Sequence, residues 1–356
     1  MTQTVQFLPF DQPLPASHRA DCDAAARLSY TLDADWFQHL AAHALPAGAR
    51  AYWCLAETGA EDRACLPLAL RDDANGALVN YYSTYYTPVL SRPEAAALLP
   101  GMLTALRQRW PGVGRWWFYP ADPAAPAQVA LFAALRGAGL IPFRYFCFGN
   151  WHLPCAGMDW EAYLKTRTSK MRSNIKRMSR KLEEAGGVLE VLTTPEQAEE
   201  AIRAYETVYA SSWKKPEPFP EFMPGLVRLA AAKGWLRMGV VRLDGAPVAA
   251  QLWLACQGRA AIYKVAYDER CKDYSPGLVL TAHLLRHALE QDRVTEVDYL
   301  MGDDEYKRTW MSERRERWGI VAYNPRTPAG LLGLAQEWAG RAAKTLGGRL
   351  RRGKGG

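Results

Sequence analysis

The stretch from Ala260 to Trp310 constrains the fold more than any other part of the chain. It contains an apolar run (AIYKVAYD), a polar loop (ERCKDYSPG), a helical pattern (LVLTAHLLRHALEQ) and a second short apolar run (EVDYL). A strand, a loop, a helix and a strand in this order predict a right-handed crossover with the two strands side by side and parallel. We therefore expect an α/β (α+β) fold built on a mixed, twisted sheet flanked by helices.

The predicted helix of this crossover begins at the tripeptide Ser275-Pro276-Gly277. Ser275 is suited to cap the helix, Pro276 fits its first position, and Gly277 leaves backbone N–H groups uncovered. A helix start of this kind attracts anions, which favours a phosphorylated ligand there. The same tripeptide also opens ordinary strand–helix connections, so that alternative stays open.

The order of predicted elements in this stretch also occurs earlier in the chain. The matching starts are Arg50 with Trp235, Ala77 with Ala260, Pro93 with Pro276 and Arg115 with Glu296, which lie 185, 183, 183 and 181 positions apart. A nearly constant offset favours two copies of one fold over two unrelated domains. We expect domains at residues 1–155 and 156–326, followed by a basic helix and tail at 327–356.

The two copies differ at the helix start. In the first copy Arg92-Pro93-Glu94 replaces the Ser-Pro-Gly tripeptide, and the Glu94 carboxylate there repels a phosphate. We therefore expect only the second copy to bind a phosphorylated ligand and the first to shape the site for a second ligand. The loop around Tyr85 is rich in tyrosine, and Tyr85 is a candidate contact for a sugar or peptide, although aromatic loops often only pack.

Positive charge is concentrated in two places. Residues 163–181 carry eight Lys or Arg and no acid, and residues 341–356 carry six and no acid, within a net charge of +7. The first cluster lies on a helix expected from Trp160 to Ala185, and the second on a weakly amphipathic segment at Gly330–Leu350. We expect mostly solvated faces rather than a nucleic-acid site, with peripheral membrane contact or docking on the protein as alternatives for the C-terminal segment.

Composition limits the class of protein. A chain of 356 residues has room for two cores. It has no apolar run near the roughly 18 residues that span a bilayer, and its seven cysteines contain no CxxC pair. We expect a cytoplasmic protein, or one at the inner face of the membrane, without a disulfide framework or a metal site.

Three groups of residues together resemble a known family. They are Tyr263-Lys264-x-x-Tyr267, then Ser275-Pro276-Gly277, then Asp298-Tyr299-Leu300-x-Gly302-Asp303-x-x-Tyr306-Lys307. Their order and spacing resemble the GNAT-type acyltransferases of the CelD-like group, which are similar to the FemAB aminoacyltransferases. The resemblance covers residues 160–325 and implies a tandem pair of GNAT-like lobes. One feature departs from it, because the usual Gln/Arg-x-x-Gly-x-Gly/Ala pyrophosphate loop is absent.

The resemblance implies a donor site and two catalytic groups. Two parallel strands would separate around the thioester arm of acetyl-CoA or another acyl-CoA, and Tyr306 would protonate the leaving thiolate. Asp303 is the candidate base or water-relay group, with a helix cap as its alternative role. The candidate donor-binding residues are Ala266, Tyr267, Ser275, Pro276, Gly277 and Lys307.

The expected activity is transfer of an acyl group to an amine. The resemblance implies an amino sugar or a cell-envelope or polysaccharide precursor as the acceptor, and Trp213, Lys214, Lys264 and Tyr85 are the candidate residues for binding it. Aminoacyl-tRNA as the donor, or a binding module without catalysis, are the alternatives. Only the tRNA alternative involves nucleic acid, and no oligomeric state is predicted.

Overall fold

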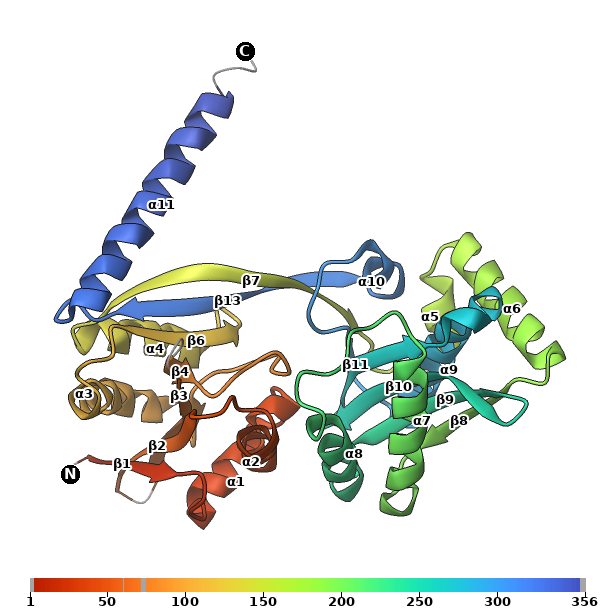
Figure 1. The fold of residues 1–356 in the computed structure, drawn as a ribbon, viewed down its shortest axis with the longest axis horizontal. Helices are drawn as coiled ribbons and strands as arrows, with labels where there is room; N and C mark the ends of the chain where they lie inside the picture. Colours follow the sequence, from red (N-terminus) through yellow and green to blue (C-terminus); the bar gives the residue numbers. More distant parts are fainter. Residues whose placement is uncertain (1–2, 60, 72–74, 353–356) are drawn as a thin grey trace. The chain divides into compact units, whose positions relative to one another are not determined.

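The same order of strands and helices occurs twice along the chain, in a computed structural model that describes residues 3–59, 61–71 and 75–352 (Figure 1). The first copy comprises β1 (Thr4–Pro9), α1 (Ala16–Ala25), α2 (Ala34–His43), β2 (Arg50–Thr58), β3 (Asp62–Leu70), β4 (Asn75–Ala77), α3 (Leu99–Arg109), β6 (Arg115–Ala121), α4 (Pro126–Gly137) and β7 (Ile141–Pro154). The second comprises β8 (Val188–Leu192), α7 (Ala198–Ala210), α8 (Phe222–Ala232), β9 (Leu236–Leu243), β10 (Ala246–Cys256), β11 (Arg259–Tyr267), α9 (Pro276–Glu290), β12 (Glu296–Asp298), α10 (Glu305–Trp310) and β13 (Glu313–Tyr323). The predicted tandem repeat is confirmed.

Further elements lie between or after the copies. They are β5 (Val89–Leu90), α5 (Trp160–Lys165), α6 (Ser169–Glu184), α11 (Pro328–Arg352) and four short 3₁₀ helices at Tyr30–Leu32, Pro93–Leu98, Pro195–Gln197 and Glu269–Tyr274. The C-terminal helix forms as expected, with Leu331, Leu332 and Trp338 exposed on it. None of the helices in the described residues combines the length and the apolar character needed to cross a membrane.

The chain divides into two units that exchange a strand. Unit one contains Met1–Ala24, Leu45–Cys147 and Arg317–Gly356, and unit two contains Ala25–Ala44 and Phe148–Glu316. These units do not coincide with the expected boundaries at 155, 156 and 326, which follow the two copies. In unit two, the end of β7 pairs antiparallel with β12. In unit one, the end of β13 pairs antiparallel with β6. Each sheet is therefore completed by the last strand of the other copy.

Unit two carries the stretch on which the fold prediction rests. Its sheet has the order β7-β12-β11-β10-β9-β8, and β11 and β12 are parallel as predicted. Helix α9 packs on β9 and β10 so closely that a Cβ on Gly239 would lie 2.6 Å from Leu284 Cδ1. The turn between β9 and β10 has positive φ values of 50° at Asp244 and 77° at Gly245, which confirms the predicted tight hairpin.

The basic segment after β7 forms two helices where one was expected. Helix α5 ends at Lys165 and α6 begins at Ser169, and the Thr168 side chain accepts a hydrogen bond from Met171 N at 3.2 Å. A hydroxyl that bonds the backbone of the next turn favours a helix start over a helix interior. The continuous helix from Trp160 to Ala185 was therefore wrong.

Candidate active site

Strands β11 and β12 separate after a short region of pairing. They pair only from Arg259 opposite Glu296 to Ala261 opposite Asp298, whereas β11 continues to Tyr267. Beyond Asp298 the chain follows β7 instead, since Tyr299 N donates to Trp151 O at 2.9 Å and Gly302 N to Gly149 O at 3.2 Å. One edge of β11 is therefore left without a strand partner beside it.

A buried amide holds the two strands apart. Asn150 is 1% exposed, and its Nδ2 donates to Asp298 Oδ1 at 2.6 Å and to Leu300 O at 2.9 Å. Its Oδ1 accepts from Arg315 Nε at 2.7 Å, and Arg315 also pairs with Glu296 at 2.8 Å. Two hydrogen-bonded charges beside one amide fix the end of β12 on the β7 side. Sequence reasoning missed Asn150, because its partners lie about 150 positions away.

The gap holds a cavity of about 390 Å³. Its walls come from β11, the start of α9, the β12–α10 connection and the segment before α8. The lining residues are Trp213, Gln251, Val265, Ala266, Tyr267, Lys272, Ser275, Pro276, Gly277, Leu278, Thr281, Tyr299 and Tyr306. The structure thus brings together five of the six predicted donor-binding residues, together with Trp213 and Tyr306.

The first turn of α9 has an unusual start. Ser275 adopts the left-handed conformation (φ 48°, ψ 48°), and its side chain forms no capping hydrogen bond, so the predicted Ser275 side-chain cap was wrong. Its N–H donates to Lys272 O at 2.9 Å instead. A Cβ on Gly277 would lie 3.2 Å from the Tyr267 ring. Glycine at this position keeps the cavity open between the helix and the strand.

A buried polar side chain of β10 bonds the first turn of α9. Gln251 is 1% exposed and donates from Nε2 to Gly277 O and to Thr281 Oγ1, both at 2.9 Å, while its Oε1 accepts from Trp253 Nε1 at 3.0 Å. A buried and fully used amide fixes the groups around it. Gln251 was not predicted, and a lone polar residue in the apolar run of β10 was its only signal.

Two tyrosines lie at the far end of the cavity. Tyr306 on α10 is 46% exposed, and its ring lies edge-on to the Tyr299 ring at 6.1 Å. Tyr299 is 4% exposed, its hydroxyl forms no hydrogen bond with the described residues, and burial raises its pKa well above the usual range. A buried donor without a partner costs free energy unless a ligand satisfies it. Tyr299 was part of the family pattern but was not predicted as a site residue.

Asp303 does not line this cavity. It accepts hydrogen bonds from Arg314 Nη2 at 2.7 Å and from Trp151 Nε1 at 3.0 Å. The Arg314 guanidinium lowers the pKa of this carboxyl, which makes it a weak base. The N-cap position of α10 belongs to Asp304, whose side chain forms no capping hydrogen bond. Asp303 is therefore not the cap of α10, and its part as a base or water relay remains a prediction.

Lys307 does not line the cavity but contacts Tyr299, which does. Its Nζ donates to Met301 O, pairs with Asp304 at 3.7 Å, and lies 5.4 Å from the centre of the Tyr299 ring. Burial lowers its pKa. These contacts assign Lys307 to support of the Tyr299 ring, and its predicted donor contact remains a prediction.

The predicted acceptor residues of unit two lie near the Trp213 side of the cavity. The Trp213 ring packs on Tyr267 at 4.8 Å. Lys264 is buried and pairs with Glu217 at 2.7 Å. Burial, reinforced by the charge of Lys264, lowers the pKa of Lys214 to about 8. Tyr85 belongs to unit one, where the Arg317 guanidinium lies 5.0 Å from its ring centre, and its contact with an acceptor remains a prediction.

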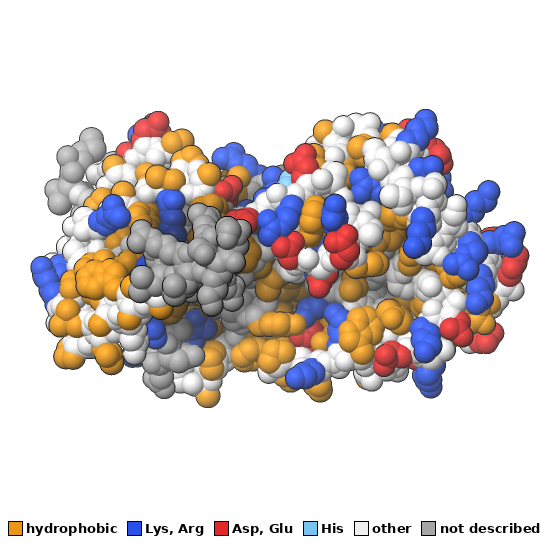
Figure 2. All heavy atoms as spheres, turned by 90° about the horizontal axis from the view of Figure 1, so that it is seen from above, with side chains coloured by type: hydrophobic (Ala, Val, Ile, Leu, Met, Phe, Trp, Pro, Cys, Tyr) orange, Lys and Arg blue, Asp and Glu red, His pale blue; other side chains and the backbone are white. Residues whose placement is uncertain are grey.

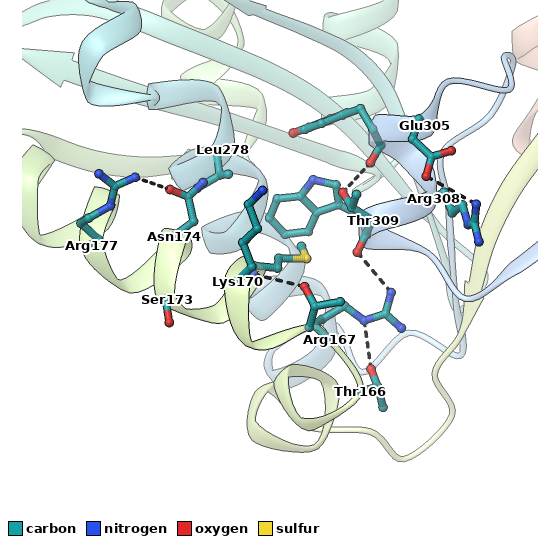
Figure 3. Close-up of a pocket in the computed structure, with 14 residues that line it drawn as sticks. Thr166, Arg167, Lys170, Ser173, Asn174, Arg177, Leu278, Glu305, Arg308 and Thr309 are labelled. Carbon is teal, nitrogen blue, oxygen red and sulfur yellow. Dashed lines mark hydrogen bonds and ion pairs between the residues drawn. The ribbon is translucent and has the colours of Figure 1, made fainter.

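A second cavity of about 860 Å³ lies between α6, the first turn of α9 and α10. Figure 3 shows side chains from these three helices around it, including Lys170 and Asn174 from α6, Leu278 from α9 and Thr309 from α10. Leu278 and Tyr306 line both cavities. Among the described residues, no group of three or more His, Cys, Asp or Glu is placed to hold a metal.

Separated parallel strands, a helix that begins in the gap and a tyrosine beyond the second strand define the GNAT class of acyltransferase fold. Residues 169–308 match the family described as the acetyltransferase (GNAT) domain. No match was found among the curated proteins.

Solved structures share this fold across most of the chain. FemX has a TM-score of 0.57 at 10% identity, with 91% of this chain and 97% of that chain covered. L-PGS from Bacillus licheniformis has a TM-score of 0.51 at 14% identity, with 74% of this chain and 84% of that chain covered. The fold class is confirmed as a mixed α/β tandem of GNAT-like lobes.

Proposed function

We propose that this chain is an N-acyltransferase that moves an acyl group, acetyl in the simplest case, from acyl-CoA to an amine. The observation that carries the proposal is the 390 Å³ cavity, which runs along the open edge of β11 and reaches Tyr306. A narrow cleft with polar groups along one wall is suited to an extended thioester arm. The GNAT domain match over residues 169–308 supports the same reaction class.

The open strand edge supplies hydrogen bonds for the arm. Asp268 N donates toward β10, to Val248 O at 2.8 Å. Because backbone N–H groups alternate along a strand, the N–H of Tyr267 points to the opposite edge, into the cavity. That N–H is therefore the candidate donor to the thioester oxygen, whereas the N–H of Ala266 faces β10 and Ala266 contributes only to the wall.

The reaction needs one proton donor near the sulfur. The amine nitrogen attacks the carbonyl carbon, the carbon–sulfur bond breaks, and the leaving thiolate takes the proton of the Tyr306 hydroxyl. The proton lost by the amine passes to solvent, and the Tyr306 phenolate, on a side chain that is 46% exposed, regains a proton from solvent. Tyr299 lines the same cavity, and its ring lies edge-on to the Tyr306 ring at 6.1 Å, so its role in this proposal is to position Tyr306.

The acceptor is proposed to approach from the Trp213 side. An exposed tryptophan beside a lysine and a buried ion pair is suited to a polar ring such as an amino sugar, which is present in cell-envelope and polysaccharide precursors. We also propose that the chain belongs to the CelD-like group. Helix α11 is proposed to contact the inner face of the membrane.

Purified protein and its Tyr306→Phe variant test the proposal directly. Isothermal titration with acetyl-CoA should show binding to both proteins, and acetyl transfer to glucosamine or another amino sugar, followed by mass spectrometry, should fall about 100-fold or more in the variant. Equal transfer rates would exclude Tyr306 as the acid. If wild-type protein binds neither acetyl-CoA nor CoA, the acyl-CoA donor is refuted. Binding of acetyl-CoA without transfer to any amine would favour a binding module.

A further inference from the structure

The cavity between α6 and α10 continues the one that is proposed to hold the acyl arm. Its volume is about 860 Å³, and Tyr306 and Leu278 contribute to the walls of both cavities. A ligand that lies along β11 and passes these two side chains therefore reaches α6. This helix precedes the repeated elements of unit two and has no counterpart in the first copy.

Positive charge dominates the wall of this second cavity. Four of its lining residues are cationic and one is acidic, namely Arg167, Lys170, Arg177 and Arg308 against Glu305. Figure 2 shows Lys and Arg side chains gathered at the right-hand end of the view, where α6 lies. An anionic ligand is the chemistry that such a wall favours.

Two of these cations are available to a ligand. Arg167 donates to Met311 O at 2.9 Å, and Arg308 pairs with Glu305 at 3.5 Å. Lys170 has no ion pair or hydrogen bond with the described residues and extends from α6 into the cavity (Figure 3). Arg177 donates only to Asn174 Oδ1, at 2.8 Å, which leaves most of its guanidinium N–H groups available.

The start of α9 offers few donors of its own to a phosphate. The N–H of Ser275 bonds Lys272 O at 2.9 Å, Pro276 has no N–H, and the N–H of Leu278 bonds Ser275 O at 3.0 Å. Of these four positions, only Gly277 keeps an N–H without an acceptor in the turn. A diphosphate has more acceptor oxygens than one N–H can satisfy, so further donors must come from elsewhere.

We propose that Lys170 and Arg177 of α6 bind the phosphate groups of the donor's carrier, in place of the missing glycine-rich loop. This assignment rests on the proposed acyltransferase function, because it places the carrier's acyl arm in the cavity along β11. The shared chemistry is a phosphate ester, which either coenzyme A or the end of an RNA chain supplies.

Two acyl donors that differ only in their phosphate-bearing part test the assignment. Acetyl-CoA carries phosphates, whereas S-acetylpantetheine has the same thioester arm without any phosphate. Lys170→Ala and Arg177→Ala should each weaken acetyl-CoA binding about tenfold in isothermal titration and leave S-acetylpantetheine unchanged. The matched control is Lys176→Ala, because Lys176 is exposed on the same helix and lies outside the lining. Circular dichroism checks that each variant is folded.

The outcomes separate this assignment from the proposed function. If the two variants lose affinity equally for acetyl-CoA and S-acetylpantetheine, or lose affinity for neither, the phosphate site is overturned. If wild-type protein does not bind acetyl-CoA, the proposed donor fails, and inorganic pyrophosphate and a short RNA ending in CCA are titrated instead. Loss of affinity for either probe in Lys170→Ala and Arg177→Ala supports the phosphate site with another carrier. Affinity equal to that of Lys176→Ala would overturn it.

Discussion

The side chain of Asn150 donates from Nδ2 to the main-chain carbonyl of Leu300 at 2.9 Å. Together with the main-chain bonds from Tyr299 N to Trp151 O and from Gly302 N to Gly149 O, it holds the chain beyond β12 beside β7 and away from β11. The same amide accepts from Arg315 Nε at 2.7 Å, so one buried side chain joins β7, β12 and β13. Asn150 therefore helps to keep β11 and β12 apart, although it lines neither cavity.

Replacing this amide should damage both stability and the opening. In Asn150→Ala the carbonyl of Leu300 and the guanidinium of Arg315 each lose a buried partner, so the free energy of unfolding should fall by about 2 kcal/mol. Urea unfolding measures the change in stability. Titration with acetyl-CoA, at a temperature where the variant is folded, measures the affinity, which should fall if the cavity closes. Unchanged stability together with unchanged affinity would contradict the role given to Asn150.

The buried hydroxyl of Tyr299 should oppose folding. Since it forms no hydrogen bond among the described residues, Tyr299→Phe should leave the protein equally stable or more stable by about 1 kcal/mol. Thermal unfolding measures the change. A clear loss of stability in this variant would show that the hydroxyl bonds within the protein.

A single methyl group at the start of α9 should narrow the cavity. A Cβ at Gly277 would lie 3.2 Å from the Tyr267 ring. Gly277→Ala gains helix propensity of up to about 1 kcal/mol, so unfolding should be nearly unchanged or shifted in the stabilising direction. Affinity for acetyl-CoA should fall about tenfold. The control is Gly137→Ala on α4 of unit one, where a Cβ meets no atom within 4 Å, and equal affinities in both variants would contradict the prediction.

The stability of the protein should depend on the charge of Lys214. Burial lowers its pKa from 10.5 to about 8, so between pH 8 and pH 10.5 the unfolded chain binds this proton and the folded chain does not. The free energy of unfolding therefore rises with pH across that window. Below pH 8 the buried charge of Lys214 destabilises the folded state most. Lys214→Met should be more stable than wild type by about 2 kcal/mol at pH 7 and by much less at pH 10.

Urea unfolding at pH 7 and pH 10 measures the difference for Lys214→Met. Lys176→Met, at an exposed position on α6, provides the control and should match wild type at both values of pH. A stability gain for Lys214→Met that is the same at pH 7 and pH 10 would show that packing rather than charge is responsible.

Local patterns in the sequence were sufficient to predict the parallel crossover and the tandem repeat. Apolar runs of strand length alternate with helical patterns, and these periods report which face of each element is buried. The position of α9 followed from Pro276, because its missing N–H and restricted φ suit a helix start. The participation of Ala266, Tyr267 and Tyr306 in one cavity followed from the family pattern, and their geometry agrees with it.

Contacts between distant residues could not be predicted in this way. The ion pair of Arg314 with Asp303, which joins α10's preceding loop to β13, is one of them. Two local details were missed as well: Ser275 is left-handed, with its N–H donating to Lys272 O, and the helix breaks before α6, where Thr168 accepts from Met171 N. Gln251 stands out as a polar residue in an apolar run and Glu217 lies in a polar loop, but neither position indicates its partner, Gly277 or Lys264, which lies 26 or 47 positions away.

By itself, the sequence determined the order of the elements, the two copies and the kind of residue at each helix start, because these depend on side-chain period and on local backbone preferences. Only the tertiary structure decided which strand completes each sheet and where β11 and β12 separate. Those choices depend on hydrogen bonds such as the one from Asn150 to Leu300, whose partners lie 150 positions apart and meet only when the chain has folded.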